Sequence, residues 1–139
     1  MSKQCLYVQQ MQHLQELGLE LDYNTMLSWI VDERGKDKPL LCISSEAVDY
    51  VDFSHYCLPA YTLQDVLDAL PKDISKDGCT WYASLYIDFE NNRIAYGNTD
   101  RYGFEIYHEI MIEKDLIDAA YSMLCWAIEN KFVETNKNE

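Results

Sequence analysis

The sequence predicts a single α+β domain, in which a mainly antiparallel sheet (a hairpin plus a three-stranded meander) is packed by three helices, with the long C-terminal helix at the centre. Apolar residues recur with the period of a helix near both chain ends and at 62–70. Between 81 and 110 the pattern changes to the alternation that is typical of half-buried strands. The 139 residues suffice for one domain, so we expect residues 1–133 to share one core and 134–139 to form a flexible tail.

The first expected element is a helix over residues 4–18. Tyr7, Met11 and Leu14 fall at i, i+4 and i+7, so they share one face of this helix. Gly18 stands where a C-terminal cap belongs. The outward positions are mostly glutamine, so only one face is expected to pack against the rest of the domain.

A β-hairpin is predicted for residues 26–43. Two apolar runs, 26–31 and 40–43, flank a polar loop that contains Gly35. Residues 44–61 show no clean period, and we expect an ordered loop there, with or without a short strand.

The clearest element is a helix over residues 62–70. Thr62 is a good N-cap, and Asp65 follows three residues later, close to the pattern of a capping box. Pro71 ends the helix. The apolar side chains fall at i, i+3, i+4 and i+7: Leu63, Val66, Leu67 and Leu70.

The next part of the chain predicts the meander. From 81 to 89 the odd positions are apolar, and Asn91 with Asn92 can form a two-residue turn. Residues 104–110 alternate again, with His108 on the apolar side. The register that follows from the turn has two apolar pairs: Phe89 with Ile94, and Ile87 with Tyr96.

The chain is expected to close with a helix over about 113–131. Between Ala119 and Ile128 only Ser122 is polar, so this helix is apolar nearly all round. Such a helix is either central to the fold or half-covered by a partner. If a homodimer forms here, we expect its seam to include Tyr121 and Trp126.

The charge of the chain restricts its partners. Eleven basic and 24 acidic residues give a formal net charge of −13. Nucleic-acid affinity comes largely from Lys and Arg on phosphates, so we predict no direct nucleic-acid binding and no membrane binding. The acidity either serves solubility or steers the protein toward a basic partner, which includes the imitation of a nucleic acid.

Cysteine usage points to a reducing compartment. The five cysteines are an odd number without a CxxC pair, and the first residues show no apolar signal region. No stretch reaches the roughly 18 consecutive apolar residues of a membrane span. We therefore expect a cytoplasmic protein with reduced thiols at Cys5, Cys42, Cys57, Cys79 and Cys125.

The motifs of common enzyme classes are missing from the sequence. It contains no G-x-S-x-G elbow and no glycine-rich phosphate loop. His55-x-Cys57 has metal-like spacing, but a zinc site needs more ligands than these two. We predict no catalytic residue, no metal and no cofactor; a small hydrolase or metal-dependent enzyme that uses the 49–57 loop is the least favoured alternative.

The polar face of the meander is the candidate binding surface. Tyrosine is enriched at protein interfaces, because it offers a large rigid area with a polar tip. The alternative is that another part of this chain packs over these rings. The expected surface combines Tyr82, Tyr86, Asp88, Glu90, Glu105, Tyr107 and Glu109.

Several segments, in this order, also resemble a known group of proteins. They are the helix pattern Gln9, Met11, Leu14, Leu17 and Gly18, then Trp29, the segment 59–71, and the ending 116–131. Together they resemble small uncharacterised proteins encoded by phages, prophages and mobile elements of gut bacteria. The resemblance covers about half of the chain; residues 36–58 depart from it. It implies an intracellular setting and no reaction type.

These observations predict a non-catalytic interaction protein of phage or mobile-element type. It would bind a basic host protein through the acidic, tyrosine-rich surface. The alternative is a structural homodimer.

Overall fold

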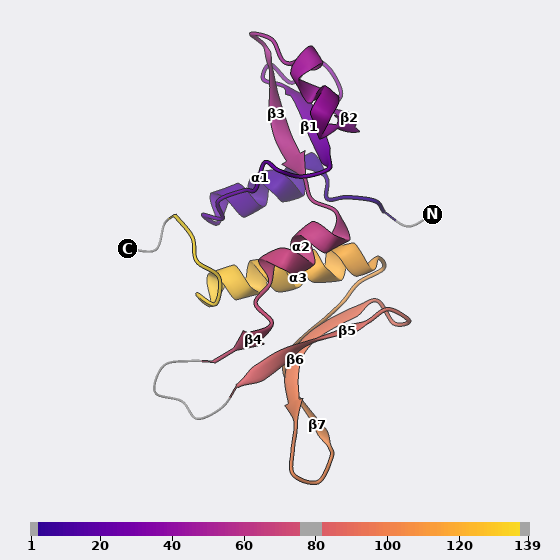
Figure 1. Cartoon of the computed structure of the whole chain (residues 1–139), viewed down its shortest axis with the longest axis vertical. Helices are drawn as coiled ribbons and strands as arrows, with labels where there is room; N and C mark the ends of the chain where they lie inside the picture. The colour runs from indigo at the N-terminus through magenta and orange to yellow at the C-terminus, as the bar shows by residue number, and fades with distance from the viewer. Residues whose placement is uncertain (1–2, 76–81, 137–139) are drawn as a thin grey trace.

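The computed structural model describes residues 3–75 and 82–136, which form an α+β fold as the sequence predicts (Figure 1). The elements in chain order are α1 (Val8–Glu16), β1 (Leu27–Asp32), β2 (Leu40–Ile43), the 3-10 helix η1 (Ser44–Tyr50), β3 (His55–Ala60), α2 (Leu63–Ala69), β4 (Asp73–Ile74), β5 (Ala83–Asp88), β6 (Arg93–Thr99), β7 (Glu105–Ile112) and α3 (Leu116–Glu129).

The strands form two antiparallel sheets, whereas the sequence pattern predicts one. The first has the order β2-β1-β3 and the second the order β4-β5-β6-β7. In Figure 1, α1 lies beside the first sheet, and α2 and α3 lie between it and the second. Strand β3 pairs with the edge of β1 that β2 leaves free, which completes the first sheet. The helices fill the space between the two sheets, so the sheets stay separate.

Strand β3 lies in the segment 44–61, for which the sequence predicts an ordered loop with or without a short strand. It pairs with β1 along six residues, from Ala60 opposite Leu27 to His55 opposite Asp32. The strand packs against both η1 and α1, so its burial does not alternate and no period of two is visible. Pro59 is tolerated because β3 is an edge strand.

Helix α1 is shorter than predicted but ends as expected. Gly18 adopts a φ of 99°, and the N–H of Leu19 donates to the Leu14 carbonyl at 3.0 Å. Before the helix the chain is extended, and the N–H of Leu6 donates to the Tyr61 carbonyl at 2.8 Å. This bond holds the segment before α1 against the end of β3.

Helix α2 confirms the predicted cap. The N–H of Thr62 donates to the Asp65 carboxylate at 2.9 Å, and the Thr62 hydroxyl accepts from the N–H of Asp65 at 3.4 Å. The helix ends at Ala69, just before Leu70 and Pro71.

The meander forms, but the predicted register is wrong by two residues. Ile87 faces Ile94 and Leu85 faces Tyr96, so four residues instead of two connect β5 to β6. Asp88 causes the difference, because its carboxylate accepts from both the backbone and the side-chain N–H of Asn91. A shift of two keeps the paired residues of β5 and β6 on their predicted faces. Phe89, expected opposite Ile94 on the apolar face, instead lies in the connection and is exposed. Residue 81, the expected start of this strand, lies outside the described residues.

A bulge in β7 changes which of its residues face the helices, so the predicted alternation of this strand is wrong beyond Tyr107. Tyr96 faces Glu109 whereas Gly97 faces Tyr107, so His108 is the additional residue. The alternation reverses there. Glu109, expected on the outer face, lies on the face of Tyr96, while Ile110 lies opposite Ala95 on the outer face. His108, expected on the apolar side, is exposed.

Helix α3 is central, as predicted. It contacts α2, β6 and β7, and eight of its residues are buried. Within residues 3–75 and 82–136, no helix is long and apolar enough to cross a membrane. Beyond α3, the N–H of Asn136 donates to the Gly18 carbonyl at 2.8 Å; the last three residues of the expected tail lie outside the described residues.

Candidate functional site

Small residues on the central strand of the second sheet make the floor of the candidate site. Ala95 and Gly97 alternate with Ile94 and Tyr96, so they face away from the helices. Both are buried beneath their neighbours; Ala95 lines the site, and Gly97 lies beside it. A Cβ atom on Gly97 would lie 2.8 Å from Cδ1 of Tyr107. Glycine therefore lets the Tyr107 ring lie directly across the strand.

Two tyrosines make the walls. Tyr86 projects from β5 and Tyr107 from β7, on either side of β6. Their ring centroids are 6.5 Å apart and the ring planes are nearly perpendicular, at 89°. This edge-to-face arrangement is favourable and holds both rings in place. The Tyr86 side chain nevertheless remains 41% exposed.

Charged groups surround the rings. The Arg93 guanidinium lies 3.3 Å from the Asp88 carboxylate and 5.5 Å above the centre of the Tyr107 ring. The Tyr107 hydroxyl donates to Glu105, and this bond raises the pKa of Tyr107 above its usual value. Hydrogen bonds from Asn91 lower the pKa of Asp88. Asp88 is therefore ionised at neutral pH and contributes a negative charge to the site.

These groups line an open groove of about 420 Å³, here named the tyrosine groove. From the expected surface it contains Tyr86, Asp88, Glu90, Glu105 and Tyr107. It also contains Phe89 and Arg93, which the sequence analysis did not assign to the site. The sequence alternation does predict the position of Arg93. Arg93 and Ala95 flank the apolar Ile94, so both are expected on the outer face of the strand.

Two residues of the expected surface lie outside the groove. Glu109 was displaced to the opposite face by the bulge. Tyr82 is exposed, but it precedes β5 and does not line the groove. Its carbonyl accepts from the side chain of Asn98 at 2.8 Å. The groove thus contains five of the seven residues of the predicted surface.

No described helix covers the groove. Helix α3 contacts β6 and β7 from the face that carries Tyr96, and the described helices lie on that side of the sheet in Figure 1. The sequence left open whether part of this chain packs over the tyrosines. Within the described residues, the outer face is open to a partner.

The two residues of the expected dimer seam pack against their own chain. Trp126 lies between Tyr96 and Phe132, at centroid distances of 6.0 and 5.4 Å. Tyr121 contacts the His13 ring edge-on at 6.4 Å. Homodimerisation through α3 stays a prediction, and these rings already have intramolecular partners.

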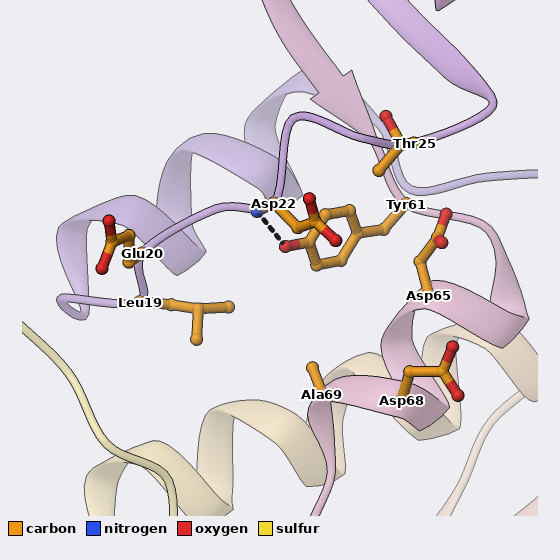
Figure 2. A pocket seen from close by; sticks show the side chains of 8 residues that line it. All are labelled: Leu19, Glu20, Asp22, Thr25, Tyr61, Asp65, Asp68 and Ala69. Atoms are coloured by element: carbon orange, nitrogen blue, oxygen red, sulfur yellow. Dashed lines mark hydrogen bonds between the residues drawn. The ribbon is translucent and has the colours of Figure 1, made fainter.

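A second hollow lies between residues 19–25 and α2 (Figure 2). It measures about 280 Å³, and its lining includes the carboxylates of Asp22, Asp65 and Asp68. The buried Tyr61 hydroxyl accepts from the N–H of Asp22 at 2.8 Å. Asp65 caps α2 and Asp68 accepts from Gln64, so these carboxylates already have structural partners.

His55 meets carboxylates instead of Cys57. Its Nδ1 lies 2.9 Å from Asp52 and its Nε2 lies 3.2 Å from Asp37, so it joins the two loops beside β1. Ligand atoms of Asp32, Asp37 and His55 lie within 4.8 Å of one another. Both Asp32 oxygens, however, accept backbone N–H groups, which lower its pKa to about 2. The His55 imidazolium therefore forms an ion pair with Asp52 and Asp37.

This ion pair predicts a pH-dependent stability. The bond to Asp52 raises the pKa of His55 above 6.5, so the folded state binds the proton more tightly than the unfolded chain. The stabilisation is complete below about pH 6.5 and is lost as the pH rises through the folded-state pKa. We expect the difference in free energy of unfolding between wild type and His55→Gln to shrink from pH 6 to pH 8 in urea titrations.

Asp52→Asn is the control, because it removes the main cause of the raised pKa. In that background the same His55→Gln difference is expected to vary much less with pH. A wild-type difference that is constant over this range would contradict the ion pair.

The described cysteines Cys5, Cys42, Cys57 and Cys125 are free thiols; Cys79 lies outside the described residues. Comparisons of the chain with protein-family models, curated proteins and solved structures found no match.

Proposed function

We propose that this protein is a non-catalytic interaction protein that binds a basic protein partner through the tyrosine groove. One observation carries the proposal: an ordered pair of tyrosines, flanked by carboxylates, stands on a sheet face that no described helix covers. Tyrosines in such a setting are typical anchors of protein interfaces.

The charge of the molecule supports a basic partner. The formal net charge is −13, and Asp88, Glu90 and Glu105 line the groove together with a single cation, Arg93. Such a field accelerates the encounter with a basic surface and repels nucleic acids. The rings then supply the short-range contact area that charge alone does not provide.

The setting of the interaction belongs to the same proposal. A phage or mobile-element protein that occupies a basic host protein would present carboxylates where that host protein otherwise meets phosphates. This setting rests on the sequence resemblance alone. The homodimer and the small enzyme remain alternatives.

The test is an NMR titration of the ¹⁵N-labelled full chain with a short peptide that contains both lysine and arginine. We expect shifts of the amide signals in β5, β6 and β7, and a weaker interaction at high salt. Combining Tyr86→Ala with Glu105→Lys is expected to abolish these shifts while the rest of the spectrum shows an intact fold.

Asp68→Lys is the matched control, because it makes the same change of charge at the other hollow. It is expected to leave the shifts in β5 to β7 unchanged. The proposal is wrong if the peptide perturbs residues 19–25 and α2 instead, or if Asp68→Lys weakens binding as much as the groove variant does.

A further inference from the structure

The geometry points to arginine as the side chain that the tyrosine groove selects: we propose that it binds a guanidinium group of the partner in preference to an ammonium group. This inference rests on the proposed function, because it concerns the partner of the same groove. It goes further by naming the chemical group that is recognised.

The groove already holds one guanidinium, that of Arg93. Its Nη2 atom lies 3.3 Å from the Asp88 carboxylate, and its central carbon lies over the Tyr107 ring, 5.5 Å from the ring centre. A guanidinium is better suited to both contacts than an ammonium group. It is planar and weakly hydrated, which favours packing on an aromatic ring, and it presents a fork of N–H donors to a carboxylate. The protein therefore shows its own mode of guanidinium binding.

The groove has the groups to receive a second guanidinium. Tyr86 stands perpendicular to Tyr107 with its side chain 41% exposed, and Phe89 at the rim is 66% exposed. Glu90 and Glu105 add carboxylates beside these rings. With Asp88 there are three carboxylates to one guanidinium in the groove, so an incoming cation meets a net charge of −2.

A second copy of this chain fits the groove less well than a basic partner. The hairpin between β6 and β7 does carry an arginine, Arg101, but its guanidinium already lies 5.0 Å above the ring of Tyr102. Each copy also brings a formal net charge of −13. The two copies would repel each other at the distances over which a basic partner is attracted.

The test compares two peptides of equal length and charge, one with arginine and the other with lysine at every basic position. Binding to the full chain is measured by calorimetry and located by amide shifts. We expect the arginine peptide to bind about twofold to fivefold more tightly. A cation–π contact at an exposed site is worth a factor of this size, and a planar, weakly hydrated guanidinium forms it more readily than an ammonium group does. Nonspecific attraction to the acidic chain acts equally on both peptides and cancels in this ratio.

Tyr86→Leu isolates the contribution of the ring. Leucine keeps an apolar side chain on the strand but offers no aromatic face, so the ratio of the two affinities is expected to approach one. Tyr102→Leu is the matched control, since Tyr102 is exposed on the hairpin outside the groove. It is expected to leave the ratio unchanged.

The outcomes separate this inference from the proposed function. Equal affinity of the two peptides, with amide shifts in β5 to β7, overturns the selection of arginine and leaves the groove as the binding site. Equal or tighter binding of a trimethyl-lysine peptide also overturns it, because that group has no N–H fork. An absence of groove shifts with every peptide overturns the proposed function itself.

Discussion

Replacing Tyr96 by alanine is expected to lower the free energy of unfolding by about 3–5 kcal/mol, the range for the loss of a large buried aromatic side chain. Tyr96 has no exposed surface and packs on Trp126, so it joins the second sheet to α3. Its hydroxyl donates to the Pro71 carbonyl at 2.6 Å and so also fixes the segment after α2. Urea unfolding followed by tryptophan fluorescence measures the loss.

Tyr96→Phe separates the ring from the hydroxyl. It keeps the packing but leaves the Pro71 carbonyl without this donor, so the expected loss is only about 1–2 kcal/mol. If Tyr96→Ala costs no more than Tyr96→Phe, the ring does not join the sheet to α3 as described.

Gly97→Ala is expected to have the next largest effect, a loss of about 1–3 kcal/mol typical of overpacking. The added Cβ atom would lie 2.4 Å from the backbone oxygen of Ile106, which cannot move away as a flexible side chain could. Either β7 shifts or the bulge rearranges, and both move Tyr107. We therefore expect altered amide signals across β5 to β7 and a weaker interaction with basic peptides. The lower free energy of unfolding is measured by urea titration.

Gly103→Ala is the control for this variant. Gly103 has a φ of 86° but no heavy atom within 4 Å of an added Cβ. Its replacement costs conformational strain of about 1–2 kcal/mol and leaves the groove intact. If Gly97→Ala changes neither stability nor the signals of β5 to β7, the close approach of Tyr107 to β6 is not required.

Much of the candidate site could be predicted from the sequence, because its key residues alternate on regular strands. Tyr86 and Asp88 share the outer face of β5, and Tyr107 and Glu105 share that of β7, as the alternation indicates. Arg93 was not assigned to the site, although the alternation already places it on the outer face of β6. What opposes Arg93 across the sheet is Asp88, and that pairing depends on the register.

The sequence by itself determined the elements whose signals are local. Helix α2 has its cap in Thr62 and Asp65 and its end at Pro71, α1 ends at Gly18, and the hairpin pairs as expected. Local hydrogen bonding, proline chemistry and hydrophobic period act within a few residues, so they can be read before the chain folds.

Only the tertiary structure decided how these elements meet. Strand β3 lacks a period because η1 and α1 cover it, and its pairing with β1 divides the strands into two sheets. A register slip of two leaves the faces of the paired residues unchanged, so the alternation could not reveal it. The bulge at His108 exchanges the faces of Glu109 and Ile110 through contacts with β6 that are distant in sequence. Long-range pairing, which no local signal encodes, thus gave the tyrosine groove its final set of residues.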